Sequence, residues 1–259
     1  MIARNLDECT ALLSGSSGGI AFEIAAQLAE AGVPRIMLNG RNQKRGEEAC
    51  LRLKERAPNI DVRFTAADPT IKADARRLVD TTVKEFGSLD IVVTSVSGHL
   101  MPRPFHEIPF EGIDLLIGAH LSSVLYTCRA ALPHLIARGG GVILTMASDA
   151  AKIATPGEVV IGSAKAGVVM FARTLALECS RYGIRVHALT PSIVKDTAAY
   201  DRAMSNEFSR KIFTKAESRA KLGVVTPQDI AQLAVFLASP SASKMTGQAI
   251  SVNGGISAA

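Results

Sequence analysis

The chain has 259 residues, of which 47% are hydrophobic and 20% are charged, and its net charge is +5. This length suits one large domain that buries about three quarters of the surface of its unfolded chain, and the composition excludes a disordered protein. The basic residues are scattered and rarely lie beside aromatic ones, so the charge indicates an anionic cofactor rather than nucleic acid.

The N-terminal segment and the cysteines bear on location. Asp7 and Glu8 precede any apolar run, which differs from a signal peptide, and no uninterrupted apolar stretch is long enough to span a bilayer. The four cysteines are widely separated and have neither metal-site nor redox-pair spacing. We therefore expect a cytoplasmic protein with reduced thiols, no metal and no membrane partner.

Short apolar runs alternate with longer amphipathic segments along the whole chain. Seven runs have the character of buried strands, at residues 10–13, 35–38, 62–66, 91–93, 142–146, 186–189 and 249–252. Helical patterns occupy residues 21–31, 44–56, 73–86 and 230–237, and two long apolar segments occupy 109–137 and 161–181. This alternation predicts an α/β fold of the Rossmann type, with a doubly wound seven-stranded parallel sheet and helices on both faces. No linker divides residues 1–259, so we expect a single domain.

The interval 195–225 is polar and only weakly patterned, and it precedes the last helical segment. An excursion of this length in a compact domain is either a lid over a substrate or a solvated helical insertion. Both interpretations stay open at the level of the sequence.

The first predicted strand leads into a glycine-rich turn that passes directly into a helical pattern. The turn reads Ser-Gly-Ser-Ser-Gly-Gly-Ile-Ala over residues 14–21. Glycines let the chain turn sharply and let backbone N–H groups approach a pyrophosphate at the positive end of the following helix. We therefore predict a dinucleotide-binding domain whose cofactor contacts include Gly15, Ser17, Gly18, Gly19 and Ile20.

Residues after the second and third strands indicate which dinucleotide binds. No acidic residue stands where a carboxylate would hold a free ribose 2′-hydroxyl, and Arg41 stands there instead. A guanidinium pairs with a 2′-phosphate through two hydrogen bonds, so the sequence favours NADP(H) over NAD(H). Asp68 either accepts a hydrogen bond from the adenine amino group or only caps the helix that starts near Thr70.

Further motifs follow the glycine-rich turn in a fixed order. They are Leu-Asp-Ile-Val-Val at 89–93, Ser148, Ala-Lys-Ala-Gly at 164–167, Gly-Ile-Arg-Val at 183–186, Pro191, Thr-Gly-Gln at 246–248 and Val-Asn-Gly-Gly at 252–255. With these motifs the chain resembles the compact, single-domain branch of the short-chain dehydrogenase/reductases from Ala11 to its C-terminus. The resemblance implies an oxidoreductase that uses a nicotinamide dinucleotide, with additional cofactor contacts from Thr94, Lys165, Pro191 and Ile193.

The motif that carries the chemistry in that family is incomplete here. The family uses a serine, a tyrosine and a lysine four residues after the tyrosine, aided by an asparagine on the fourth helix. Ser148 and Lys165 match, but Ile161 occupies the tyrosine position and His120 the asparagine position. The tyrosine hydroxyl protonates the carbonyl oxygen, and loss of a general acid costs about 10²- to 10⁴-fold in rate, or roughly 3 to 5 kcal/mol. We therefore expect weak reduction of ordinary ketones, while Lys165 still holds the nicotinamide ribose.

Three residues are candidates for the missing acid. His120 is one, since imidazole titrates near neutrality, and the alternative is a buried histidine bonded to a backbone carbonyl. His99 follows the fourth strand, and its alternative is an exposed loop histidine. Glu158 lies seven residues before Lys165, where enoyl reductases of the broader family place their tyrosine, or else it lies on the surface. We select Ser148, Lys165 and His120 as the catalytic residues.

The sequence leaves three functions open. The first is an NADP(H)-dependent oxidoreductase with an atypical active site, acting on a small carbonyl or hydroxy compound. The second is a catalytically silent protein that binds a dinucleotide or metabolite, for which Ile161 is the argument. The third is a non-redox enzyme that reuses the cleft, with His99 or Glu158 as its base.

The two long apolar segments, 109–137 and 161–181, bear on assembly. Each carries more apolar positions than one packed face needs, and helices that are apolar on two sides need two partners. We therefore expect a homo-oligomer. The family resemblance implies a dimer or a tetramer in which these segments form the interface.

Overall fold

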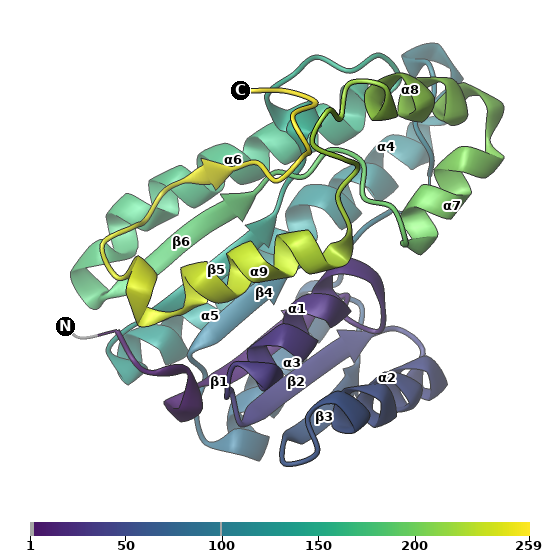
Figure 1. Cartoon of the computed structure of the whole chain (residues 1–259). Coiled ribbons are helices and arrows are strands. Elements are labelled where there is room, and N and C mark those ends of the chain that lie inside the picture. The colour runs from purple at the N-terminus through teal and green to yellow at the C-terminus, as the bar shows by residue number, and fades with distance from the viewer. Residues whose placement is uncertain (1–2, 99) are drawn as a thin grey trace.

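The computed structural model describes residues 3–98 and 100–259, which form a seven-stranded parallel sheet with helices on both faces (Figure 1). The strands are β1 (Thr10–Ser14), β2 (Arg35–Gly40), β3 (Asp61–Ala66), β4 (Ile91–Thr94), β5 (Gly141–Met146), β6 (Ile184–Leu189) and β7 (Ala249–Ile250). Their order in the sheet is β3-β2-β1-β4-β5-β6-β7. The predicted doubly wound sheet of the Rossmann type is confirmed, and its last strand ends two residues earlier than expected.

Helices connect the strands and cover the sheet. The α-helices are α1 (Gly19–Glu30), α2 (Gln43–Arg56), α3 (Lys72–Phe86), α4 (Phe110–Ile117), α5 (Ser123–Arg138), α6 (Val159–Cys179), α7 (Ala198–Ser205), α8 (Glu207–Glu217) and α9 (Pro227–Ala238). Short 3₁₀ turns are η1 (Leu6–Glu8), η2 (Phe105–Glu107), η4 (Asp149–Ala151), η5 (Ser180–Tyr182) and η6 (Pro240–Ala242), and the π-helical turn η3 (Gly118–Ser122) joins α4 to α5. Helices α1 and α9 lie together on one face, whereas α3 and α5 lie together on the other (Figure 1).

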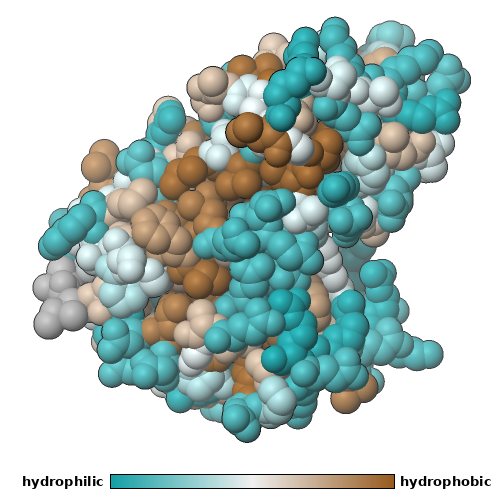
Figure 2. Space-filling model, in the orientation of Figure 1, coloured by the Kyte–Doolittle hydropathy of each residue, from teal (hydrophilic) through white to brown (hydrophobic). Residues whose placement is uncertain are grey.

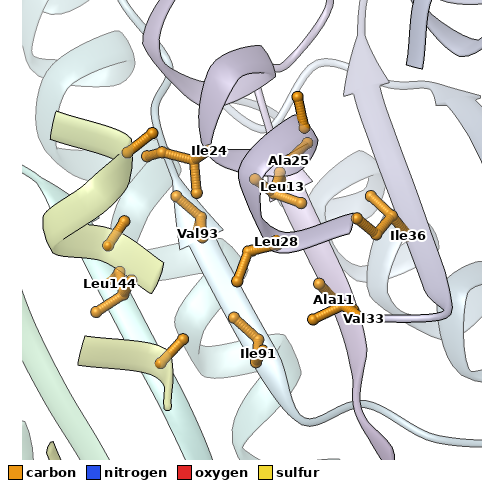
Figure 3. Packing of buried hydrophobic residues seen from close by; sticks show 14 of the residues in the cluster. Ala11, Leu13, Ile24, Ala25, Leu28, Val33, Ile36, Ile91, Val93 and Leu144 are labelled. Carbon is orange, nitrogen blue, oxygen red and sulfur yellow. The ribbon is translucent and has the colours of Figure 1, made fainter. Parts of the chain in front are cut away.

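Alternate residues of each strand supply the two halves of the core. In β1, Ala11 and Leu13 belong to the half that includes Ile24 and Leu28 of α1, as Figure 3 shows, and Leu12 belongs to the opposite half. Successive side chains of a strand point to opposite faces of the sheet. Because both faces are buried, these strands are nearly continuous apolar runs, which is the pattern that the sequence displays.

The order of the strands reverses between β1 and β4. Strands β2 and β3 extend the sheet on one side of β1, and β4 to β7 extend it on the other. In such sheets a ligand binds outside the carboxyl ends of the strands, at the point where the order reverses. Ser14 and Thr94 pair at the ends of these two strands, so the expected site lies between the turn after β1 and the loop after β4.

The interval 195–225 contains the two helices α7 and α8. The hydroxyl of Ser209 in α8 donates a hydrogen bond to the carbonyl of Pro102 at 3.1 Å. A Cβ atom added to Gly157 would lie 2.5 Å from the ring of Phe208. Helix α8 therefore packs against both the loop after β4 and the segment that leads into α6.

Two helical stretches, Phe110–Arg138 and Val159–Tyr182, are long and apolar enough to cross a membrane, judged by length and composition alone. In each stretch 44% of the most apolar window is buried inside the fold. Within them α5 packs on α3 and α6 packs on β6. Core helices of a layered fold have the same character, so these stretches are weak evidence of a membrane span.

Candidate functional site

The buried amide of Asn39 joins the carboxyl ends of the first three strands. Its Oδ1 accepts the backbone N–H of Gly15 at 3.2 Å, and its Nδ2 donates to the carbonyls of Thr65 and Ala67 at 3.0 and 3.1 Å. The carbonyl of Asn39 also accepts the N–H of Ser16 at 2.8 Å. Asn39 is fully buried, so these bonds fix the start of the glycine-rich turn relative to β2 and β3.

The glycine-rich turn needs glycine at Gly15 and leaves open space at Gly18 and Gly19. Gly15 has a φ of +65°, and a Cβ atom there would lie 2.6 Å from the carbonyl oxygen of Ser95. A Cβ atom on Gly18 or Gly19 would meet nothing within 4 Å. Helix α1 begins at Gly19, and the first N–H groups of a helix have no partner within it. The turn therefore presents backbone donors to an open space that suits an anion.

Two neighbours complete the surroundings of this turn. The guanidinium of Arg52 in α2 donates to the carbonyl of Ser17 at 3.0 Å and stacks on the ring of Phe22. The hydroxyl oxygen of Ser17 lies 3.3 Å from where a Cβ on Gly40 would stand. Ile20 follows in the first turn of α1 and is half-buried. A positive charge and a hydroxyl thus lie beside the glycine-rich turn.

Arg41 and Asp68 lie next to each other beyond β2 and β3. Nη1 of Arg41 lies 3.8 Å from Oδ2 of Asp68, and the side chain of Arg41 is 59% exposed. Such exposed pairs contribute about 0–1 kcal/mol to stability. Oδ1 of Asp68 accepts the N–H and the hydroxyl of Thr70 at 3.0 and 2.8 Å. Asp68 therefore shapes the turn before α3 but does not cap this helix, whose N-cap residue is Ile71.

His120 lies in the π-helical turn η3, which faces the loop after β4. A Cβ atom on Gly98 would lie 3.2 Å from its Nε2. In the part of the chain that the structure describes, Nδ1 of His120 and Oγ1 of Thr94 are both buried without a hydrogen-bond partner. His120 is therefore not the carbonyl-bonded histidine that one interpretation of the sequence expects.

The electrostatic surroundings of His120 differ from the expectation. Burial and the charge of Lys165 lower the pKa of the imidazole from 6.5 to about 3. The expected titration near neutrality is therefore wrong, because a second positive charge in this buried space is unfavourable. At neutral pH the side chain is a neutral imidazole.

Lys165 lies on α6 and reaches the carboxyl end of β5. Its buried Nζ donates to the carbonyl of Met146 at 2.6 Å, and burial lowers the pKa of its ammonium group from 10.5 to about 8. His120 and Lys165 interact electrostatically, so two of the three predicted catalytic residues share one space.

Ser148 is placed by the turn η4 at the end of β5. Its hydroxyl oxygen accepts the N–H of Ala150 at 3.2 Å. The N–H of Asp149 donates to the carbonyl of Pro191 at 2.8 Å, and the hydroxyl of Ser257 donates to the carboxylate of Asp149 at 2.6 Å. The end of β6 and the C-terminal segment therefore hold the turn that carries Ser148.

The remaining predicted residues occupy the ends of β6 and α6. Ile193 is buried after β6, and Ile161 is half-buried in the first turns of α6. Glu158, immediately before α6, is half-buried rather than on the open surface, and burial together with Asp149 raises the pKa of its carboxyl from 4.5 to about 7. The predicted candidate His99 lies outside the described residues.

The described residues fit a dinucleotide and give no sign of a metal ion. An open cradle lies in front of the glycines, and two orphaned polar atoms, on Thr94 and His120, lie at the other side of the strand reversal. Buried polar atoms without a partner call for a ligand or another explanation. Within 3–98 and 100–259 no group of three His, Cys, Asp or Glu side chains is arranged to hold a metal.

Comparison with known proteins agrees with this geometry. A model of the family described as Enoyl-(Acyl carrier protein) reductase matches residues 15–257. The 4-formylbenzenesulfonate dehydrogenase of Comamonas testosteroni is 30% identical over 254 residues, which are 97% of this chain and 98% of that protein. The 3-oxoacyl-(acyl-carrier-protein) reductase of Staphylococcus aureus is 31% identical over 248 residues, or 95% and 97%. The crystal structure of 3-ketoacyl-(acyl-carrier-protein) reductase from Brucella melitensis with NADH has a TM-score of 0.86 at 28% identity, covering 98% of this chain and 100% of that one.

The fold and the glycine-rich turn are those of a family that binds nicotinamide dinucleotides. The chain belongs to the short-chain dehydrogenase/reductase family, whose members among these relatives are oxidoreductases.

Two residues that hold the site together were not singled out from the sequence. Asn39 anchors three strand ends, and Asp149 joins the Ser148 turn to β6 and to the C-terminal segment. The sequence held a signal for Asn39, because this polar residue directly follows the apolar run of the second strand. The role of Asp149 depends on contacts with Ser257, more than a hundred residues away, so no local pattern reveals it.

The neutral state of His120 predicts a pH dependence of folding. Between pH 6.5 and about 3 the unfolded chain binds a proton at this residue and the folded chain does not, so stability falls as the pH decreases through this window. Relative to His120→Asn, the wild type should lose about 2 kcal/mol of unfolding free energy between pH 7.5 and 5. Urea denaturation measures it, with His106→Asn at an exposed histidine as the control. Parallel pH profiles of the wild type and His120→Asn would show that His120 is not held neutral.

Proposed function

We propose that this protein is an NADP(H)-dependent oxidoreductase with an atypical active site, acting on a small carbonyl or hydroxy compound. One observation carries the proposal. The carboxyl edge of a single sheet brings the open glycine cradle after β1 together with Ser148 and Lys165 around the end of β5. Such an arrangement suits a dinucleotide whose reactive ring extends from the cradle toward a polarising hydroxyl and a cation.

Different residues at this edge would bind different parts of the cofactor. The backbone N–H groups of the turn that includes Ser17, Gly18, Gly19 and Ile20 would hold the pyrophosphate, with Gly15 permitting the close approach to β4. Arg41 would pair with the ribose 2′-phosphate and Asp68 with the adenine amino group. Thr94, Pro191, Ile193 and Lys165 would surround the nicotinamide ribose and ring.

The chemistry at the reacting end follows from the charges there. A bound reduced nicotinamide supplies a hydride. Ser148 would donate a hydrogen bond to the carbonyl oxygen, and the ammonium group of Lys165 would stabilise negative charge as it develops on that oxygen. A neutral imidazole at His120 would serve as a hydrogen-bonding group rather than as a cationic acid.

The assembly belongs to the same proposal. Exposed hydrophobic residues occur on the two segments predicted to form the interface, among them Phe110, Leu115, Met170 and Leu177. Figure 2 shows a further group of exposed hydrophobic residues, separate from those on the two segments. It crosses the region that β7, α9 and the C-terminal segment occupy in Figure 1. Two apolar surfaces would suit a dimer that pairs into a tetramer. We also propose a cytoplasmic location, with neither nucleic acid nor a membrane as partner.

One alternative rests on a specific residue. With Ile161 in the position of the family's tyrosine, the chain would bind the dinucleotide without reducing a substrate. The same cleft would also suit a non-redox enzyme that uses Glu158 as its base. Oxidation of NADPH in the presence of a panel of small ketones and aldehydes separates the reductase from both.

Arg41 tests the proposed preference for NADP(H). Replacing Arg41 by Ala should weaken NADPH binding about 10- to 100-fold, since charge-assisted hydrogen bonds are worth about 1.5–3 kcal/mol, and should change NADH binding less than about twofold. Fluorescence titration of both cofactors measures the two effects. Lys54→Ala removes a charge from the exposed surface of α2 and serves as the control. Equal weakening of both cofactors, or tighter binding of NADH by the wild type, would contradict the preference for NADP(H).

Ile161 tests the role of the missing hydroxyl. Ile161→Tyr should raise the turnover of simple ketones about 10²-fold or more, because it supplies a hydroxyl beside Lys165 that can act as a general acid. Ile161→Phe introduces the ring without the hydroxyl and should give no gain. Steady-state kinetics with NADPH measures both, and equal rates for the Tyr and Phe variants would mean that the missing hydroxyl is not what limits reduction.

The mass of the protein in solution tests the proposed assembly. Light scattering at micromolar concentration should give the mass of a dimer or a tetramer, and Leu177→Glu should shift it toward smaller species, because a charge is unfavourable in an apolar interface. Leu51→Glu, on the exposed side of α2, should leave the mass unchanged. A monomeric wild type would contradict the proposed assembly.

A further inference from the structure

The segment after β7, residues 251–259, lies against the turn η4. The hydroxyl of Ser257 donates to the carboxylate of Asp149, the first residue of η4, at 2.6 Å. The ammonium group of Lys152, directly after η4, donates to the hydroxyl of Ser251 at 2.6 Å. Two side chains of one short turn therefore bind a segment that lies about a hundred residues further along the chain.

Asn253 fixes the hydroxyl of Ser257 from within this segment. The Nδ2 of the buried Asn253 donates to the carbonyl and to the hydroxyl oxygen of Ser257, both at 3.1 Å. Its Oδ1 accepts the N–H of Gly255 at 3.0 Å. Because the hydroxyl oxygen accepts from Asn253, its own hydrogen is directed toward Asp149. The three side chains thus form a chain of hydrogen bonds that runs in one direction, in which each bond strengthens the next.

The same segment is anchored at the base of the excursion that contains α7 and α8. The carbonyl of Gly254 accepts the N–H of Leu222 at 3.0 Å. Gly254 has a φ of +65°, and a Cβ atom there would lie 1.9 Å from the carbonyl oxygen of Gly223. The two ends of the excursion are joined where the N–H of Lys195 donates to the carbonyl of Val225 at 3.0 Å. The segment is therefore held from this side as well as by η4.

The backbone of Asp149 is bonded on both sides, and its carboxylate is buried. Its N–H donates to the carbonyl of Pro191 at 2.8 Å, and its carbonyl accepts the N–H groups of Lys152 and Ile153, both at 2.9 Å. Asp149 is only 5% exposed, so the hydroxyl of Ser257 replaces a hydrogen bond that water supplies to an exposed carboxylate. A buried carboxylate that loses its donor is unfavourable, and the turn that carries it would rearrange.

The position of Asp149 sets the direction of the Ser148 hydroxyl. Ser148 precedes Asp149 as the N-cap of η4, and its hydroxyl oxygen accepts the N–H of Ala150 at 3.2 Å. A hydroxyl has one hydrogen to donate besides the lone pairs with which it accepts. The bond from Ala150 therefore leaves the hydrogen of Ser148 for a substrate oxygen. A rearrangement of η4 would break this bond and turn the hydroxyl.

We propose that Asp149 is a positioning residue for Ser148 and that the hydroxyl of Ser257 holds it in place. The inference rests on the proposed reductase function, in which Ser148 donates to the carbonyl oxygen. Misplacement of a reacting group by about 1 Å can cost about 10²-fold in rate. The chain of hydrogen bonds from Asn253 through Ser257 to Asp149 therefore affects kcat, and its effect reaches the substrate through Ser148.

Reduction of the ketone and aldehyde panel with NADPH tests this role. Ser257→Ala should lower kcat about 10- to 100-fold, while the affinity for NADPH stays within about twofold. Ser257→Thr keeps the hydroxyl and Asp149→Asn keeps an acceptor oxygen, so both should retain most of the rate. Ser239→Ala is the control, because it removes a hydroxyl that donates to the carbonyl of Phe236 at the end of α9, and it should leave kcat unchanged.

Hydrogen exchange of the ¹⁵N-labelled full chain follows the same turn without turnover. In Ser257→Ala the N–H of Ala150, which donates to the hydroxyl of Ser148, should exchange about tenfold faster than in the wild type. The N–H of Leu144, in the middle of β5, should exchange at an unchanged rate, which shows that the sheet stays folded. The measurement therefore distinguishes a local change of η4 from a general loss of stability.

The outcomes separate this proposal from the function on which it rests. Full activity in Ser257→Ala, or an equal loss in Ser257→Thr, would overturn only the positioning role of Asp149, and so would an N–H of Ala150 that exchanges no faster in Ser257→Ala. A wild type that binds NADPH and reduces no member of the panel would contradict the reductase function itself. The exchange of Ala150 measures the effect of the Ser257 bond on the turn in either case.

Discussion

The buried side chain of Asn39 is the interaction on which the cofactor half of the site depends. Its oxygen and nitrogen connect the turn after β1 to the strand ends of β2 and β3 in a space without solvent. A satisfied hydrogen bond contributes about 1 kcal/mol, whereas a buried group left without its partner costs about 1–3 kcal/mol. An incorrect register of β1 against β2 would leave several such groups unpaired, so correct pairing of these strands and a correctly shaped turn are formed together.

In the other half of the sheet, charged side chains rather than an amide determine the structure of the site. Lys165 brings an ammonium group into a buried space beside His120, and the site accommodates it by holding the histidine neutral and by offering the carbonyl of Met146. Elsewhere, the carboxyl groups of Asp149 and Glu158 interact, and a shared environment of this kind favours the protonated form of one of them. Burial thus determines which of these groups carries a proton at neutral pH, because it shifts their pKa values away from those usual for their residue types.

The sequence predicts the framework well because its signals are local. Each strand of this sheet is buried on both faces, so apolar runs mark the strands, and the glycine-rich turn has a spacing that few other structures need. The helices α7 and α8 lie in the interval 195–225, and Thr197 and Asn206, which cap them, were readable as helix starts. The early end of β7 and the π-helical turn around His120 depend on packing against distant segments. The pKa values of His120 and Glu158 depend on burial by several elements at once, which no short stretch of sequence records.

We propose that the site transfers hydride from NADPH to a small carbonyl compound, with Ile161 in the position that the family resemblance gives to a tyrosine. The most direct measurement uses NADPH carrying deuterium at the transferable position of the nicotinamide ring, incubated with the wild-type protein and a mixture of small aldehydes and ketones. Mass spectrometry of the products should find one deuterium bound to carbon in at least one alcohol, in an amount equal to the NADPH oxidised. Bound NADPH that remains fully deuterated, with no labelled alcohol after prolonged incubation, would contradict the account and leave a protein that binds the dinucleotide without using it.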